Sequence, residues 1–532
     1  MKKIILLITL MSASITFAQW NPDTGQNLLV ANGTASIIAA EGTSTGETYV
    51  VYWKQVGVPV NYELRMQILD VDGNRTLGDD GMLISADLSM ATYTVLSTAK
   101  VDAADNIYIA VTATDGVNSV YAYKFDSSGN ELWRSNAPIG FGNKPVVLGL
   151  DSGESVFSWL SDDGALMKKF DANGTEIWDT PKPISLPGFS TIPDNFFKTS
   201  NGFVALFHKP SYSIYSTLYA QRYDADGNGL WNNPVQLTEG STTWNRYYEG
   251  IVENDILFVG YFASSDNRFD SYVQRLNPDG TLPWGINGAD IDSSQNFLEM
   301  DTSIAISSDY IWAVGRFTNS SQSTSGTFVQ KINKTSGGRE FSNQAKEIFG
   351  LGMEKSPAGE LRILDGHPVF LIADGSGSGT GATHLHAVML DDEGNFVWEN
   401  ETKPIATFDA SKGNVGLMSP YNSSIVAIFE EDKGDGNKIY AQNLVEEIVG
   451  IQEMDSIEVF ISNPIAEELF IQADFPIYQV RIFDMLGRKV ATADGALKTS
   501  MIMNTASLST GTFIIQIADA SGGVKIIKVI KK

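Results

Sequence analysis

The chain has 532 residues, a formal net charge of −26 and no cysteine. This length is too great for one ordinary core, so we expect at least two domains. The absence of cysteine excludes disulfides, catalytic thiols and cysteine-ligated zinc, and the negative field disfavours nucleic acid and anionic lipid as partners.

The first eighteen residues have the pattern of a secretory signal peptide. Lys2 and Lys3 form a positive start, an apolar run covers residues 4–11, and residues 16–18 (Thr-Phe-Ala) supply small residues at the cleavage positions. We expect cleavage after residue 18, which takes the net charge to −28 because two lysines are lost. No segment is long and apolar enough to be a transmembrane segment.

One short pattern recurs along residues 19–445. It is an apolar strand, then Asp or Asn, then a glycine turn, then in most copies an aromatic residue, as in YAYKFDSSGNELW from Tyr121 and YAQRYDADGNGLW from Tyr219. Successive copies lie 45 to 58 residues apart. The residue that begins each turn, or the matching position of a truncated last copy, is Asp70, Asp126, Asp171, Asp224, Asn277, Asn333, Asp391 or Val445.

Each repeat is predicted to form four short strands. In the second repeat, alternating apolar residues bounded by turn residues predict strands at Val95–Asp102, Asn106–Thr114, Ser119–Phe125 and Glu131–Ser135. A four-stranded sheet repeated around a ring is a β-propeller blade. The alternative is a row of separate sandwich domains, for which these repeats are small in a chain without disulfides.

The eighth repeat lacks its last strand. We predict that the segment beginning at Trp20 supplies it, because Trp20-Asn21-Pro22 resembles the sequence after Trp231. The ring would then close without a free edge. The fold prediction is therefore all-β, an eight-bladed β-propeller over residues 19–445 whose N-terminal strand closes the last blade.

The spaced aspartates of the repeat, such as Asp224 and Asp226, resemble the start of a calcium loop. An EF-hand loop needs Gly at its sixth position and Glu at its twelfth, whereas the glycine that recurs here, Gly227, is the fourth residue from Asp224, and no Glu follows at the twelfth position. Only the copies at Asp70 and Asp224 keep both aspartates, whereas the turn glycine persists. We interpret the aspartates as residues of a hairpin turn.

Few catalytic patterns are present. There is no Gly-x-Ser-x-Gly motif and no phosphate-binding Gly-Lys loop. His384 and His386 share a strand face, with His367 in the same repeat, but a third metal ligand is not evident. We therefore expect no metal and no cofactor, and we assign no catalytic residue. Paired carboxylates that converge from different blades stay open as an alternative.

Five tryptophans occupy one position of the repeat and are predicted to be blade core: Trp133, Trp178, Trp231, Trp284 and Trp398. Other aromatic residues lie in the loop Thr242–Gly250, and propeller geometry places this loop on the same face as residues 208–216 and 264–271. Exposed aromatic residues on loops suit sugar stacking or protein contact, and the alternative is packing between blades. The binding candidates are Trp244, Arg246, Tyr247 and Tyr248.

After a linker at residues 446–454, alternating apolar residues predict a small immunoglobulin-like β-sandwich at residues 455–532. It carries Asn463-Pro464, then Asp484 with Gly487, Arg488 and Val490, then Leu508, Gly511 and Phe513, and a basic end at Lys525–Lys532. Over Ser456–Lys532 these features resemble the C-terminal sorting domain of the type IX secretion system of Bacteroidetes. The family usually has Pro before Asn-Pro, where this chain has Ser462.

The resemblance implies two partners, the type IX outer-membrane machinery and its sorting peptidase, and an extracellular or cell-surface location. The residues themselves favour a non-catalytic module that binds a glycan or a protein. An extracellular polysaccharide hydrolase or lyase, with carboxylates on the propeller face, is the alternative.

Overall fold

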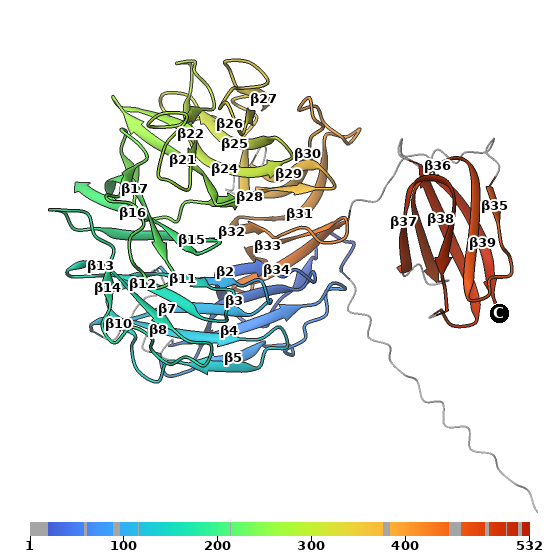
Figure 1. Ribbon diagram of the computed structural model, residues 1–532, viewed down its shortest axis with the longest axis horizontal. Coiled ribbons are helices and arrows are strands. Elements are labelled where there is room, and N and C mark those ends of the chain that lie inside the picture. The colour runs from blue at the N-terminus through green and yellow to red at the C-terminus, as the bar shows by residue number, and fades with distance from the viewer. Residues whose placement is uncertain are drawn as a thin grey trace, which may run out of the picture. The chain divides into compact units, whose positions relative to one another are not determined.

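The computed structural model describes residues 20–57, 61–88, 96–114, 116–212, 214–375, 383–445, 459–484, 489–506, 508–519 and 524–532 (Figure 1). The expected signal peptide and linker, and Gly487 and Arg488 of the tail motif, lie outside these ranges. The chain divides into two compact units, Met1–Val445 and Glu446–Lys532. Within the described ranges, no helix is long and apolar enough to cross a membrane.

The first unit is all-β and contains eight antiparallel sheets among its described residues. The first sheet has β2 (Ala35–Gly42), β3 (Thr48–Val56), β4 (Asn61–Leu69) and β5 (Met82–Ser85). The second has β6 (Thr98–Val101), β7 (Ile107–Thr114), β8 (Asn118–Phe125), β9 (Glu131–Arg134) and β10 (Gly140–Phe141). The third has β11 (Asn143–Gly149), β12 (Ser155–Ser161), β13 (Gly164–Phe170) and β14 (Lys182–Pro183).

The middle of the unit continues this plan. The fourth sheet has β15 (Ile192–Thr199), β16 (Gly202–Tyr212), β17 (Tyr215–Asp224), β18 (Val235–Gln236) and β19 (Thr242–Thr243). The fifth has β20 (Gly250–Glu253), β21 (Ile256–Ser265), β22 (Arg268–Leu276) and β23 (Ala289–Asp290). The sixth has β24 (Leu298–Ser307), β25 (Tyr310–Thr318), β26 (Ser325–Asn333) and β27 (Lys346–Phe349).

The last two sheets bring the ends of the unit together. The seventh has β28 (Lys355–Leu364), β29 (His367–Asp374), β30 (Thr383–Met389) and β31 (Thr402–Ala410). The eighth has β32 (Lys412–Leu417), β33 (Ser424–Asp432), β34 (Asn437–Val445) and β1 (Leu28–Leu29).

In the repeated turn, the glycine adopts a positive φ and the acidic residue accepts backbone hydrogen bonds. In the fourth sheet, Gly227 has φ +75° and donates its N–H to the Asp224 carbonyl at 3.0 Å. The Asp224 carboxylate accepts the backbone N–H groups of Asp226 and Asn228 at 2.9 and 2.8 Å. Asp and Asn are common at the start of such turns for this reason, and glycine adopts positive φ without strain.

Five aromatic residues of the repeat each lie against the turn glycine of the next sheet: Trp133, Trp178, Trp231, Trp284 and Phe341. A Cβ built on Gly227 would lie 2.6 Å from the ring of Trp178, and one on Gly280 would lie 3.1 Å from Trp231. Trp231 also donates its Nε1–H to the Pro278 carbonyl at 3.0 Å. The tryptophans therefore join neighbouring sheets rather than fill the interior of one.

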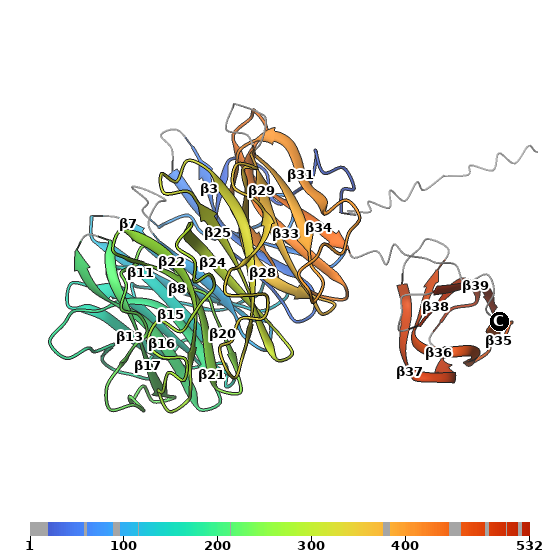
Figure 2. The same ribbon diagram turned by 90° about the horizontal axis from the view of Figure 1, so that it is seen from above.

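The sheets follow one another in a propeller-like arrangement (Figure 1). The first strands of successive sheets contact each other from β2 to β32, and the eighth sheet contacts β2 in turn. Figure 2 shows one such pair, β24 and β28, from above. Apolar clusters fill the spaces between sheets, for example Tyr49 and Met66 of the first sheet packed with Ile109 and Phe125 of the second.

The N-terminal segment completes the eighth sheet. Leu28 and Leu29 pair with Ala441 and Tyr440 of β34. Trp20 packs on Gly73 of the first sheet and donates its Nε1–H to the Val71 carbonyl at 2.9 Å. Trp20 thus behaves like Trp231, while the paired strand lies a few residues further along the chain than Trp20 itself.

The second unit is a five-stranded antiparallel sheet made of β35 (Val459–Ile461), β36 (Glu468–Asp484), β37 (Lys489–Asn504), β38 (Gly511–Asp519) and β39 (Val524–Lys531). Phe513, Ile515 and Ile517 of β38 alternate into its core, as period-two patterning requires. Asn463 accepts the backbone N–H of Ile530 on β39 at 3.0 Å, so this motif residue holds the last strand.

Replacing Trp20 with Ala tests the closure of the unit. The change removes a partly buried ring and its hydrogen bond, so we expect a loss of about 3 kcal/mol, the lower end for a tryptophan truncation. Thermal unfolding of residues 19–532 would show a lower midpoint. Phe141→Ala, which removes an exposed ring in the second sheet, is the control. Equal midpoints for wild type and Trp20→Ala would contradict this role.

Candidate functional site

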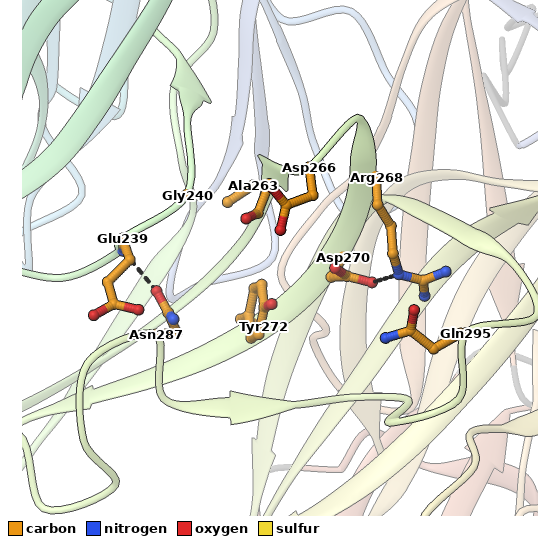
Figure 3. A pocket seen from close by; sticks show the side chains of 10 residues that line it. Glu239, Gly240, Ala263, Asp266, Arg268, Asp270, Tyr272, Asn287 and Gln295 are labelled. Carbon is orange, nitrogen blue, oxygen red and sulfur yellow. Dashed lines mark hydrogen bonds and ion pairs between the residues drawn. The ribbon is translucent and has the colours of Figure 1, made fainter.

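A cavity of about 320 Å³ lies at the turn of the fifth sheet's central hairpin (Figure 3). The hairpin β21–β22 forms one wall, and loops before and after it form the others. We refer to this cavity as the fifth-sheet pocket. Its lining residues are Glu239, Gly240, Ala263, Ser265, Asp266, Arg268, Asp270, Tyr272, Asn287 and Gln295.

The hairpin turn fixes the mouth of the fifth-sheet pocket. Ser265 pairs with Arg268, and the two residues between them, Asp266 and Asn267, have φ of +50° and +63°. A two-residue turn with both φ values positive matches the twist of the strands, and Asp and Asn tolerate it. Arg268, Asp270 and Tyr272 then lie on one face of β22, because side chains alternate along a strand.

Arg268 is held by an ion pair and by hydrogen bonds. Its Nε lies 2.5 Å from Asp270 Oδ1, and its Nη2 donates to the Ser294 carbonyl at 3.0 Å. Glu299 of the sixth sheet lies behind it, 3.4 Å from Nη2, and also accepts the Ser271 N–H at 3.1 Å. Figure 3 shows the Arg268–Asp270 pair and the bond from the Glu239 N–H to Asn287. The guanidinium is therefore neutralised and fixed in place.

The acidic groups at and behind the pocket retain protons unusually well. Burial raises the pKa of Asp270, with Arg268 opposing the shift. Burial raises the pKa of Asp290 to about 6 and that of Glu299 to about 10, and nearby carboxylates add to the rise at Glu299. Glu299 is thus a neutral acid at pH 7, and Asp270 is the acid of this group that faces the cavity.

Three loop segments converge beside the pocket, as the sequence predicted. Thr243 of β19 pairs with Tyr215 at the tip of the β16–β17 hairpin, and Ser241 bridges to Ser264 of β21. The segment between Gly240 and Trp244 therefore lies between the hairpin of the fourth sheet and that of the fifth.

The four predicted binding residues separate into two pairs. Trp244 and Arg246 are partly exposed, and Arg246 lies 3.1 Å from Asp301 and over the ring of Phe262. Tyr248 is only 3% exposed. Tyr247 donates its hydroxyl to the carbonyl of Pro145 at 2.7 Å, and burial raises its pKa. The two tyrosines pack between sheets, which is the alternative weighed above.

A Ser-His-Asp group lies next to these tyrosines. His208 Nε2 is 2.7 Å from Asp194, and Nδ1 is 2.9 Å from Ser216 Oγ. All three side chains are fully buried, and burial lowers the pKa of His208. No substrate reaches the Ser216 hydroxyl, so the group ties β15, β16 and β17 together rather than forming a nucleophile. The sequence did not single it out.

Charged side chains also converge from several sheets. Lys100 pairs with Glu41 at 2.9 Å, and Glu41 is the main cause of the raised pKa of Lys100. Burial and the charge of Glu360 raise the pKa of Glu249, which accepts the Ser303 hydroxyl at 2.7 Å. These groups come from the first, second, sixth and seventh sheets and from the start of the fifth.

The remaining sequence candidates have local partners. His384 lies 2.8 Å from Asp409, with His386 beside it. Among the described residues, no group of three or more His, Asp or Glu side chains is placed to hold a metal. In the repeat turns, the carboxylates accept backbone N–H groups. At Asp171, the N–H of Thr175 is the main cause of a lowered pKa.

The comparisons with known proteins identify the tail. Residues 462–532 match the family model described as the secretion system C-terminal sorting domain. The resemblance to the type IX sorting domain is confirmed over these residues. A search of curated proteins found no match.

Three solved structures show distant likenesses to this chain. Puromycin hydrolase has 12% identity and a TM-score of 0.41 over 78% of this chain and 61% of its own. Prolyl oligopeptidase B from Galerina marginata has 10% identity and 0.41 over 77% and 56%. An ulvan lyase has 11% identity and 0.40 over 78% and 94%. This chain thus spans less than two thirds of the puromycin hydrolase and prolyl oligopeptidase B chains.

Replacing Glu299 with Gln tests the protonation of the buried acid. The folded chain keeps a proton on Glu299 that the unfolded chain releases, so stability falls as pH rises from about 4.5 towards 10, by at most about 1.4 kcal/mol per pH unit. The variant should lose this part of the slope in urea unfolding at pH 6, 7 and 8. Glu393→Gln, at an exposed turn, is the control. An unchanged slope would show that Glu299 is ionised.

Proposed function

We propose that this secreted protein uses an eight-bladed β-propeller to bind an extracellular glycan in the fifth-sheet pocket. One observation carries the proposal: a cavity of about 320 Å³ whose lining combines carboxylates, amides, a guanidinium and one tyrosine ring. Ligand pockets begin at about this size, and a few well-placed polar groups give them specificity.

Eight blades are supported by the strand pairing. Eight sheets follow one another among the described residues, and β1 lies beside β34 in the last of them. Pairing between the first and last strands of a propeller removes a free sheet edge.

The route of export follows from the tail. The sorting domain marks the chain as a secreted protein. We further propose that a signal peptide is removed after residue 18, that the type IX machinery recognises the tail and its sorting peptidase removes it, and that the propeller is released or attached at the cell surface.

The polar lining favours a glycan over a protein ligand. Asp270, Asn287 and Gln295 offer planar hydrogen-bonding groups, as sugar hydroxyls require both donors and acceptors. The ring of Tyr272 offers an apolar surface with a polar edge. In this proposal Trp244 and Arg246 border the ligand, while Tyr247 and Tyr248 support the loop from behind.

Polysaccharide cleavage is the second candidate, and the raised pKa of Asp270 favours it. A raised pKa makes a carboxyl group a better general acid, and Arg268 and Tyr272 lie on the same strand face as Asp270. Product analysis of glycan incubated with the protein separates the candidates, since a binding module releases no shortened chains.

Replacing Asp270 with Asn should weaken glycan binding about tenfold, because a hydrogen bond to a charged group contributes about 1.5–3 kcal/mol. Gln295→Ala, at the exposed rim, should weaken it less and leave the Arg268–Asp270 pair intact. Isothermal titration of residues 19–532 with a glycan selected on an array measures both. Glu393→Gln is the matched control. Equal affinities for wild type and Asp270→Asn would exclude the fifth-sheet pocket as the site.

Deleting residues 455–532 should trap the protein before it crosses the outer membrane. The sorting domain is the export signal, so the truncated chain should accumulate in the periplasm while the full chain reaches the medium or surface. Immunoblotting of cell fractions measures this. Normal export of the truncated chain would contradict a sorting role.

A further inference from the structure

An exposed aromatic tip lies beside the fifth-sheet pocket. We call Tyr212, Ile214 and Tyr215, at the end of the β16–β17 hairpin, the tyrosine tip. Tyr212 is 81% exposed, Tyr215 40% and Ile214 39%. Tyr212 and Tyr215 are register partners, so their rings lie on one face of the hairpin. Clustered exposed apolar side chains in a secreted protein indicate a contact surface.

The hairpin that carries the tip is longer than the hairpin of the preceding sheet. Strand β16 has 11 residues, whereas β12, the equivalent strand of the third sheet, has 7. At about 3.3 Å per residue the fourth-sheet hairpin extends roughly 13 Å further. Lys209 lies 3.8 Å from the centre of the Phe189 ring, which ties the base of this extension to the preceding loop.

One segment of chain joins the tyrosine tip to the fifth-sheet pocket. Gly240 lines the pocket, and three residues later Thr243 pairs with Tyr215. Trp244 donates its N–H to the Ile214 carbonyl at 3.2 Å. Three extended residues cover about 10 Å, so the two features are neighbours on one continuous surface.

The charge of the surface restricts the ligand. The pocket lining contains three carboxyl groups, Glu239, Asp266 and Asp270, against one guanidinium, Arg268, which is already paired with Asp270. The chain as a whole carries −26. A polymer rich in carboxylate or sulfate would be repelled as it approached, whereas a neutral sugar chain would not.

Resting on the proposed glycan-binding function, we propose that the ligand is a neutral linear polysaccharide, with one end of the bound stretch in the fifth-sheet pocket and the next sugars stacked on the tyrosine tip. Tyrosine rings suit this role because they present a large flat surface and lose little side-chain entropy on binding. Affinity then depends on chain length, because only a longer chain reaches both features.

The test compares the binding of short and long ligands to residues 19–532. The probes are xylan, mannan, mixed-linkage β-glucan and starch, with the disaccharide and hexasaccharide of whichever binds, and alginate as the anionic polymer. The hexasaccharide should bind at least tenfold more tightly than the disaccharide. The double variant Tyr212→Ala and Tyr215→Ala should remove this gain and leave disaccharide affinity unchanged. Phe141→Ala removes an exposed ring elsewhere and should change neither.

The outcomes separate this inference from the proposed function. Equal affinity for both chain lengths, or hexasaccharide binding that survives the double variant, overturns the role of the tip while the pocket remains. Tighter binding of alginate than of every neutral polymer overturns the neutral ligand. Binding of no glycan at all by the wild type overturns both proposals.

Discussion

The contact between an indole ring and the turn glycine of the next sheet is the interaction on which the first unit depends. At Gly227 two demands coincide, because the turn needs positive φ and the ring of Trp178 leaves no room for a Cβ. Hydrogen bonds from the indoles of Trp231 and Trp20 to turn carbonyls fix the spacing further. One short pattern therefore sets both the hairpin within a sheet and the position of the neighbouring sheet.

These contacts lie at one end of each sheet, so the sequence and length of the hairpins at the opposite end can vary. Strand β22 begins at the fifth-sheet pocket with Arg268 and ends beside the turn that starts at Asn277. The turns at that far end hold the frame, so the hairpins at the near end can differ in length, as the 7-residue β12 and the 11-residue β16 do. Binding surfaces commonly arise on such loops above a rigid frame.

The sequence predicted the frame better than the site. The repeat located the strands of the second sheet and the place of the N-terminal segment, because turn glycines and alternating apolar residues act locally. The fifth-sheet pocket escaped, since Glu239, Asp270 and Gln295 become neighbours only when three segments meet. The packing of Tyr247 between sheets could not be predicted for the same reason, because Pro145, which accepts its hydrogen bond, lies 102 positions away in the chain.

The pairing of Leu28 with Ala441 has a consequence in time. A ribosome makes the first of these residues early and the second only shortly before the sorting domain, so the eighth sheet stays incomplete until nearly the whole first unit has been synthesised. Contacts between such distant residues form slowly. A nascent chain interrupted before β34 cannot bring its two ends together. The β1–β34 pair therefore forms only in chains synthesised through residue 445. The sorting domain follows this residue, so a chain that carries the sorting domain can also complete its eighth sheet.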